Sequence, residues 1–440
     1  MTRPCLRTIL ACSAALLFAT AGHAQLLSGL GGNPTQSVGG LFGSSNIPGL
    51  PNTAPVSAPV VDRLNDVGSS VSDTASLLDL RHERLRELVR QNHRVLDIDQ
   101  SGNLVRKGEI IAIDPSIETL AHLRSAGYRV LHDDQIECLQ LHVVTVAPPT
   151  GTDTRDGLNK LRKIDPAGEF DYDHVFEPAG IGLLPFAGTA ATATLHGQAM
   201  IGMIDGGVAA HPSLRNAAIE QRGFASSGAR PSGHGTAVAS LMVGSDGRFQ
   251  GAALGASLLV ADVYGGDPTE GSALAIARAL GWLTSRGVRV INISLVGPAN
   301  PLLARAIAVA AARGVLIVAA VGNDGPAAPP AYPASYPEVI AVTGVDKHNR
   351  ALVEAGKALH LDFAAPGADM AAALPGKGYA TVRGTSFAAP LVTARLIAAG
   401  GGTAGMAAVS REVVKGEGRV GRGVVCETCR IAPPAVGARR

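Results

Sequence analysis

The sequence predicts an α/β fold: a doubly wound parallel sheet with helices on both faces, preceded by a smaller α/β domain. Three observations predict it. The chain has 440 residues and 46% apolar content, enough for two to four structural units and a sizeable core. From Ala199 onward, apolar strands alternate with helices, which is typical of a parallel sheet covered on both faces. Between residues 107 and 176, shorter strands and helices alternate in a separate block.

The first 24 residues have the pattern of an export signal. Arg3 and Arg7 precede an apolar stretch from about residue 9 to about residue 20, and small residues lead up to Ala24. The stretch is shorter than the roughly 18 residues that a membrane span needs. We therefore expect cleavage after Ala24, no stable membrane anchor after signal removal, and a secreted or periplasmic protein. Lipidation at Cys12 is the alternative.

Residues 25–61 are predicted to be a linker, because they contain no charged side chain and are dominated by Gly, Pro, Ser and Asn. A charged amphipathic helix is predicted from Asp73 onward. One apolar face of this helix is formed by Leu78, Leu85, Leu88 and Val89, and its charged residues Arg81, Glu83, Arg84 and Glu87 are expected elsewhere on its surface.

The small domain is predicted as a strand–helix–strand–helix–strand unit, an open α/β sandwich of about 70 residues. Its elements are residues 109–113, 116–126, 139–146, 154–163 and 169–175. The larger domain is predicted to contain strands 199–204, 257–263, 288–294, 315–321 and 339–345, and helices 235–243, 271–286 and 302–313. In such a sheet, ligand sites lie at the carboxyl ends of the strands.

Four motifs in a fixed order carry the candidate chemistry. Asp205 stands in Met-Ile-Asp-Gly-Gly-Val, His234 in Gly-His-Gly-Thr, Asn323 in Val-Gly-Asn-Asp-Gly, and Ser386 in Gly-Thr-Ser-Phe-Ala-Ala-Pro. An acid, a base, an amide donor and a nucleophile form the complete set for acyl transfer to a hydroxyl. Each motif alone has a simpler explanation, as a turn or as a helix cap. Four of them together favour a catalytic site.

The order and surroundings of these motifs resemble those of the subtilisin-like serine proteases, over roughly residues 198–425. The resemblance implies that Ser386 attacks the peptide carbonyl, His234 takes and returns the proton, and Asp205 orients the imidazole. It also implies that Asn323 and the Ser386 amide stabilise the oxyanion, and that the substrate is a protein or peptide. A catalytically silent binding protein and a serine hydrolase acting on esters are the alternatives.

In that family, the strand ending near residue 295 pairs with the substrate as an added strand. The resemblance assigns substrate binding to Ser294, Leu295, Val296, Gly297, Gly322 and Ala331. Val296 replaces a glycine of the family and is expected to reshape one wall. Because the segment 331–337 has no acidic side chain, we expect an apolar or bulky residue before the cleaved bond.

The resemblance also implies a domain organisation. Residues 62–176 are expected to be a propeptide-like domain that binds the cleft, 177–197 a processing linker, 198–425 the peptidase domain, and 426–440 a C-terminal tail. The processing site is expected between Asp173 and His196. An accessory domain unrelated to folding is the alternative for residues 62–176.

Several other functions are not favoured. Nucleic acid is not an expected partner, because the net charge of +2 is spread along the chain and no basic run contains interleaved aromatics. Cys426 and Cys429 lack a second ligand pair, so a local disulfide is favoured over a metal site. No dense acidic cluster suggests calcium, so neither a metal nor a cofactor is expected.

Overall fold

The computed structural model describes residues 74–179, 199–376 and 378–438. The predicted signal (1–24), the predicted linker (25–61) and most of the predicted processing linker (177–197) lie outside the described residues. Residues 177–179 of that processing linker are described, and they form part of the fold.

The first described region consists of one helix followed by a small α/β domain. Helix α2 (Thr74–Gln91) leads into an antiparallel sheet in the order β1-β2-β4-β3, with β5 paired to β2. The strands are β1 (Leu96–Ile98), β2 (Leu104–Ile113), β3 (Arg129–Ile136), β4 (Leu141–Ala147) and β5 (Glu169–His174). Helices α3 (Ile117–Ser125) and α4 (Thr154–Ile164) cover one face. The predicted elements are present, and β1 and β3 are additional strands.

The two faces of this small sheet have different partners. One face packs against α3 and α4 through Leu123, Leu158 and Leu161. The opposite face, which includes Ile111 and Val143, belongs to the same apolar cluster as two helices of the larger domain. The described part of the small domain is therefore docked by a continuous apolar interface rather than by a few surface contacts.

The larger domain is built on a seven-stranded sheet in which every neighbouring pair is parallel. The strand order is β18-β17-β16-β14-β7-β13-β9. The bounds are β7 (Met200–Asp205), β9 (Ile219–Gly223), β13 (Ser257–Asp262), β14 (Val290–Ile293), β16 (Leu316–Ala320), β17 (Val339–Val345) and β18 (Phe363–Pro366). The predicted fold class is confirmed, with β9 and β18 as two additional edge strands.

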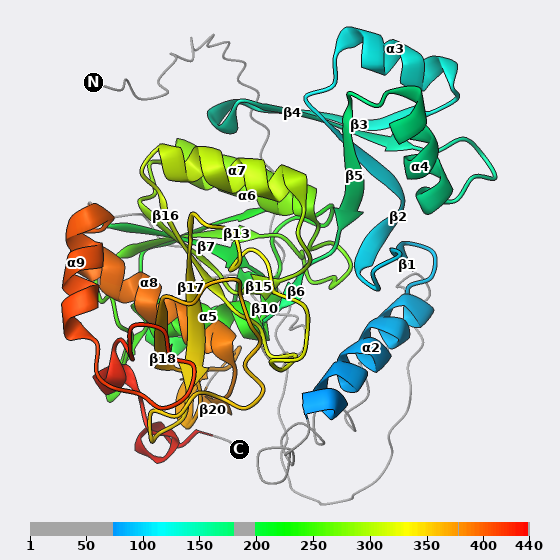
Figure 1. The fold of residues 1–440 in the computed structure, drawn as a ribbon. Coiled ribbons are helices and arrows are strands. Elements are labelled where there is room, and N and C mark those ends of the chain that lie inside the picture. The colour runs from blue at the N-terminus through cyan, green and yellow to red at the C-terminus, as the bar shows by residue number, and fades with distance from the viewer. Residues whose placement is uncertain (1–73, 180–198, 377, 439–440) are drawn as a thin grey trace, which may run out of the picture. The chain divides into compact units, whose positions relative to one another are not determined.

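Helices cover both faces of this sheet, as Figure 1 shows. Helices α5 (Gly233–Val243) and α8 (Ala389–Ala398) pack on one face. Helices α6 (Ala273–Ser285) and α7 (Pro301–Ala312) pack on the other, where they also meet the small sheet. Because the strands are buried on both faces, the carboxyl edge of the sheet is where polar groups can gather.

The small domain also contacts α6 through a buried acid. The Oδ1 atom of Asp173 accepts a hydrogen bond of 3.1 Å from the backbone N–H of Leu274, in the first turn of α6. Burial raises the pKa of Asp173 to about 6, and the nearby Glu109 carboxylate adds to this effect. The interface thus contains a carboxyl group that is easier to bury in its protonated form.

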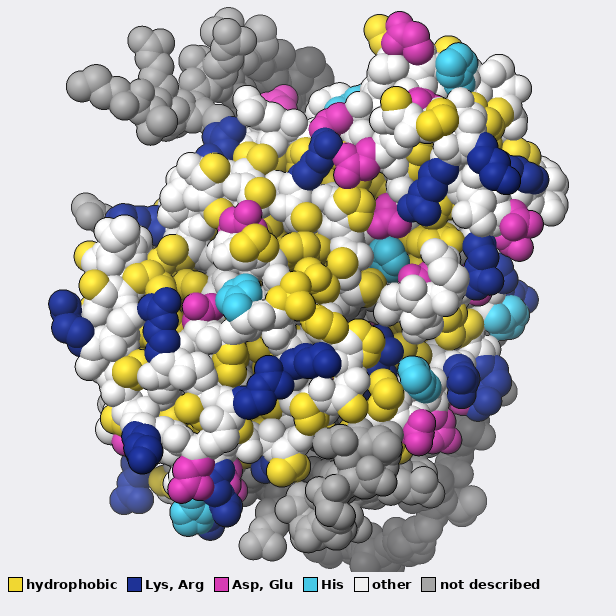
Figure 2. Space-filling model, in the orientation of Figure 1, with side chains coloured by type: hydrophobic (Ala, Val, Ile, Leu, Met, Phe, Trp, Pro, Cys, Tyr) yellow, Lys and Arg dark blue, Asp and Glu magenta, His cyan; other side chains and the backbone are white. Residues whose placement is uncertain are grey.

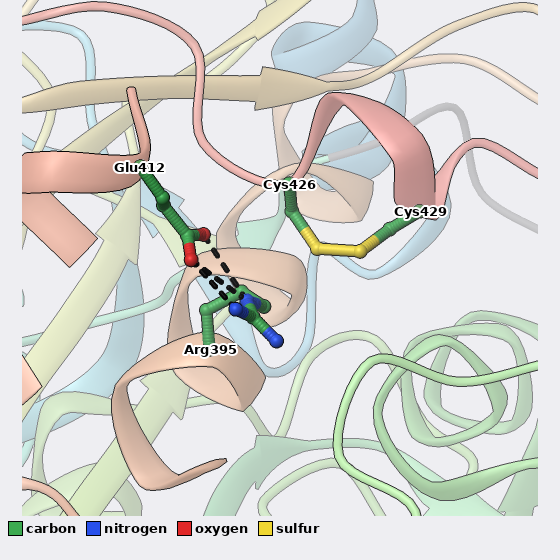
Figure 3. Close-up of a disulfide and its surroundings, with 4 residues drawn as sticks. All are labelled: Arg395, Glu412, Cys426 and Cys429. Carbon is green, nitrogen blue, oxygen red and sulfur yellow. Dashed lines mark hydrogen bonds and ion pairs between the residues drawn. A yellow bond between two sulfur atoms is a disulfide. The ribbon is translucent and has the colours of Figure 1, made fainter. Parts of the chain in front are cut away.

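The C-terminal segment is packed against the sheet domain. A disulfide joins Cys426 and Cys429, and α9 (Gly402–Glu412) is tied to α8 by the ion pair of Arg395 with Glu412 (Figure 3). The carbonyl of Ile431 accepts a hydrogen bond from the strand β19 (Met370–Ala373). The predicted tail is therefore a structured extension of the domain, and the cysteine pair is the local disulfide that the sequence favoured.

Within the described residues, no single helix has the length and apolarity of a membrane span. One pair, Thr385–Ala398 with Gly402–Glu412, meets the length and composition test only when both halves are joined across a 120° bend. On the described surface that Figure 2 presents, basic and acidic side chains are intermixed.

Candidate active site

The first half of the site lies where β7 ends and α5 begins. Asp205 is the last residue of β7, and His234 is the second residue of α5. The Nδ1 atom of His234 lies 2.8 Å from Oδ1 and 2.9 Å from Oδ2 of Asp205. The backbone N–H of Gly206 also donates to this carboxylate, at 2.7 Å. A hydrogen bond from Nδ1 to the carboxylate leaves Nε2 as the basic nitrogen of a neutral imidazole.

Glycine at position 235 makes this approach possible. A Cβ atom there would lie 2.2 Å from the carbonyl oxygen of Gly206, so a larger residue would separate the helix from the strand. Ser232 caps the helix by accepting the Gly235 N–H at 2.9 Å, and its hydroxyl donates to the Gly207 carbonyl at 3.2 Å. These backbone contacts fix the position of His234 relative to Asp205.

A second carboxylate, which was not predicted from the sequence, lies beside Asp205. Asp262 ends β13 and pairs in register with Asp205 at the same edge of the sheet. It accepts backbone N–H groups from Arg230 at 2.7 Å and from Tyr264 and Gly265 at 2.9 Å. Burial raises the pKa of Asp262 even so. The sequence did contain a signal for Asp262: the predicted apolar strand 257–263 has an aspartate near its carboxyl end, as the strand that ends at Asp205 has.

The second half of the site lies at the start of α8. Ser386 is in the short 3₁₀ turn Thr385–Phe387, and its backbone N–H donates to the carbonyl oxygen of Ala179 at 3.3 Å. The Nδ2 atom of Asn323 donates to the same oxygen. The Oδ1 atom of Asn323 accepts the Thr385 N–H at 3.0 Å, which turns Nδ2 toward Ala179. Two donors on one carbonyl oxygen are the arrangement that stabilises a tetrahedral oxyanion.

The backbone around Ser386 is held by polar contacts from the neighbouring strand. The hydroxyl of Ser294 donates to the Ser386 carbonyl at 2.9 Å, and the Asn292 side-chain amide donates to that hydroxyl at 2.9 Å. The rings of Phe387 and His234 lie 5.5 Å apart between their centroids. The fold therefore brings the predicted Asp205, His234, Asn323 and Ser386 into one site, in which Asn323 is partly buried and the other three are buried.

Residues 176–179 occupy the cleft. Strand β6 (Glu177–Pro178) pairs antiparallel with β15 (Leu295–Val296), and the Ala179 N–H donates to the Ser294 carbonyl at 2.8 Å. On the other side, the Phe176 N–H donates to the Gly271 carbonyl at 2.7 Å. A peptide segment that is paired with one strand and has a carbonyl on two donors lies as a bound substrate would lie.

The predicted substrate-binding residues surround this segment. Ser294, Leu295 and Val296 pair with it, and the ring of Phe176 lies so close to Gly297 that a Cβ atom there would be 2.5 Å from the ring. A cavity of about 230 Å³ extends beyond it. The lining of this cavity includes Arg81, Leu85, Glu177, Val296, Gly297, Gly322, Asp324 and Ala331. Arg81 and Leu85 are lining residues that the sequence pattern does not predict.

The arrangement suits proton transfer and nucleophilic attack. The Nε2 atom of His234 and the Oγ atom of Ser386 are buried, and neither has a hydrogen-bond partner among the described residues. They are the base and nucleophile atoms that such a reaction uses. Among residues 74–179, 199–376 and 378–438, no group of three or more His, Cys, Asp and Glu side chains is placed to hold a metal ion.

Comparison with known proteins gives consistent matches. The model of the subtilase family matches residues 197–399. Subtilisin BL of Lederbergia lenta is 36% identical over 197 residues, which is 44% of this chain and 72% of that protein. This chain also matches the structure of fervidolysin from Fervidobacterium pennivorans, a keratinolytic enzyme related to subtilisin. The match covers 76% of this chain and 62% of the fervidolysin chain, with a TM-score of 0.61 and 18% identity. The epidermin leader peptide processing serine protease from Staphylococcus aureus covers 73% of this chain and 97% of its own, with a TM-score of 0.56 and 16% identity.

Proposed function

The chain belongs to the subtilase family and is a serine-type endopeptidase, and on this premise we propose that Asp205, His234 and Ser386 are its catalytic triad. In this mechanism, Nε2 of His234 takes the Ser386 proton as Oγ attacks the carbonyl carbon. Asp205 orients the ring through Nδ1 and stabilises the imidazolium that forms. The contacts of 2.8 and 2.9 Å between Nδ1 and the carboxylate support this assignment.

The oxyanion would be stabilised by Asn323 and by the backbone N–H of Ser386. Both groups donate to the carbonyl oxygen of Ala179, so they already lie where negative charge would develop if that carbonyl were attacked. His234 would then return the proton to the leaving nitrogen, and a water molecule would hydrolyse the acyl-enzyme by the same steps in reverse.

The protein is further proposed to process itself between Ala179 and Gly180, within the interval that the sequence predicted. The observation that carries this proposal is that two donors converge on one carbonyl oxygen, that of Ala179. Residues before the cut would remain bound as an inhibitory product because β6 stays paired with β15. An apolar or bulky residue was expected at this position, and Ala179 is apolar but not bulky.

Export and removal of residues 1–24 belong to the same proposal. A precursor that keeps its cleft filled would not digest other proteins before it leaves the cell. The disulfide between Cys426 and Cys429 supports an oxidising destination, such as the periplasm or the exterior.

To test this, residues 25–440 are expressed in three versions. They are the parent sequence, Ser386→Ala, and Ser226→Ala as a matched control at an exposed serine. Intact mass is followed over time together with hydrolysis of casein and of a short-chain ester. The parent and the Ser226 variant should yield fragments ending at Ala179 and beginning at Gly180, and should then digest casein. Equal cleavage of the Ser386 variant would refute self-processing, and ester hydrolysis without casein hydrolysis would favour the esterase alternative.

A further inference from the structure

Helix α2 carries two arginines on the side that faces the rest of the protein. Leu85 and Leu88 pack into an apolar cluster with β1 and β2, and Leu77 is 4% exposed. Arg81 and Arg84 lie between these leucines in the sequence, and their side chains are 14% and 33% exposed. The helical pattern of the sequence predicts both arginines away from the apolar face. Charged groups on an inner helix face need partners, so their contacts are informative.

Both arginines bind carboxylates beside the cleft. The guanidinium of Arg84 forms two hydrogen bonds of 3.2 Å with the Glu177 carboxylate, from Nε and Nη2, and it also contacts Asp324 at 3.2 Å. Arg81 pairs with the other oxygen of Asp324 at 3.2 Å. Burial by itself would lower the pKa of Arg84, but the Glu177 and Asp324 carboxylates outweigh it and raise this pKa above its ordinary value. Arg84 is therefore held as a cation between two acids.

These two acids belong to the two segments that take part in the proposed cleavage. Glu177 is two residues before Ala179 in the strand that fills the cleft, and Asp324 directly follows Asn323. Leu77 adds an apolar contact in the same place, because a Cβ atom at Gly325 would lie 2.9 Å from the Leu77 side chain. One helix thus touches both the bound strand and the loop that carries the oxyanion donor.

The backbone pairing of strand β6 is short, so the side-chain contact between Glu177 and Arg84 can add to its binding. The pairing of β6 with β15 spans only Glu177 and Pro178, and a proline has no N–H to donate. Backbone pairing is the usual source of affinity for an added strand, and here the N–H groups of Phe176 and Ala179 on either side of β6 contribute one contact each, whereas Pro178 can contribute none. A bidentate Arg–carboxylate contact adds geometric specificity to this short pairing.

We propose that α2 is a strap over the cleft, in which Arg84 is a positioning residue that aligns the self-cleaved strand and then delays its release. This inference rests on the proposed self-processing. Arg84 acts through Glu177 and Asp324 and touches no reacting atom. Since its pairs are partly exposed, their loss should slow self-cleavage by roughly threefold to thirtyfold, not abolish it.

The experiment compares the full precursor, residues 25–440, with Arg84→Ala, Arg84→Lys and Arg86→Ala. Arg86 is exposed on the same helix and serves as the matched control. Two quantities are measured: the rate of cleavage after Ala179, and the lag between that cleavage and activity on a separate peptide substrate. Arg84→Ala should slow cleavage and shorten the lag. Arg84→Lys should be intermediate, because it keeps the charge but not the fork, and Arg86→Ala should match the parent.

Two further measurements separate the strap from a folding defect. The mature fragments released from all variants have the same sequence, so their kcat/KM values should be equal, and a difference would indicate misfolding of the precursor. Added salt should narrow the gap between the parent and Arg84→Ala, since screening weakens partly exposed ion pairs. Parent-like cleavage and lag in Arg84→Ala would overturn the strap while leaving self-processing intact. Cleavage of the Ser386→Ala precursor at the parent rate would overturn the proposed function instead.

Discussion

Replacing Asn323 with alanine should slow self-cleavage of the precursor sharply with little effect on its fold. The change removes one of the two donors to the Ala179 carbonyl and leaves the Ser386 N–H in place. In proteases of this type, loss of such a donor costs roughly 10²- to 10³-fold in kcat, or about 3–4 kcal/mol. The Thr385 N–H also loses its acceptor, which should cost about 1 kcal/mol of stability. The first effect concerns the transition state, and the second concerns the native state.

The assay is a single-turnover measurement of cleavage after Ala179 in the purified precursor, with thermal unfolding recorded alongside. Asn323→Asp is the matched variant, because its carboxylate can still accept the Thr385 N–H but cannot donate to the oxyanion. Both variants should cleave at least about a hundredfold more slowly than the parent. A rate within about threefold of the parent in a normally folded Asn323→Ala precursor would show that the second donor is dispensable.

Three other changes follow from the same structure. Gly235→Ala should cut kcat strongly while the fold survives, because the new methyl group would meet the Gly206 carbonyl, and kinetics with circular dichroism on one sample would check it. A catalytically blocked precursor should lose up to about 3 kcal/mol of stability as pH rises through about 6, because the raised pKa of Asp173 means that the folded state favours its protonated form. Asp173→Asn should flatten this dependence, and thermal melts from about pH 4 to pH 7 would measure it. Replacing Cys426 and Cys429 by serine should cost at most about 2 kcal/mol, because the loop they close is only three residues in separation, and a larger loss in denaturant titrations would contradict this entropic account.

The central part of the fold could be predicted because its pattern is local and strong. The five central strands are apolar runs buried on both faces, and each polar motif follows directly after such a run or opens a helix. The edge strands β3 and β9 could not be found in this way. Strand β3 contains Arg129, His132 and Asp133 with exposed side chains, and β9 contains Glu220 and Arg222. These two strands face solvent, so they lack the apolar signal that marks a buried strand. The other edge strand, β18, is apolar and buried, but it is only four residues long.

The side-chain contacts around the cleft also could not be predicted, because their partners are far apart in the sequence. Arg84 meets Asp324 across 240 residues of sequence, and Asp262 meets the Arg230 N–H across 32 residues. Helical periodicity sorts side chains by polarity, so it assigns an arginine to solvent unless a distant partner is known. The family resemblance gave the positions of the proposed catalytic residues, but the partners of Arg84 and Asp262 are particular to the folded chain.

The position of Asp262 bears on how the site carries charge. Asp205 and Asp262 end adjacent parallel strands in register, and the Asp205 carboxylate adds to the burial that raises the pKa of Asp262. Asp262 has three backbone N–H partners, whereas Asp205 has the Gly206 N–H and the imidazole of His234. Of the two carboxylates, only Asp205 contacts His234, through Nδ1. In the proposed mechanism, His234 becomes positively charged when it takes the Ser386 proton, and the Asp205 carboxylate at Nδ1 stabilises that charge.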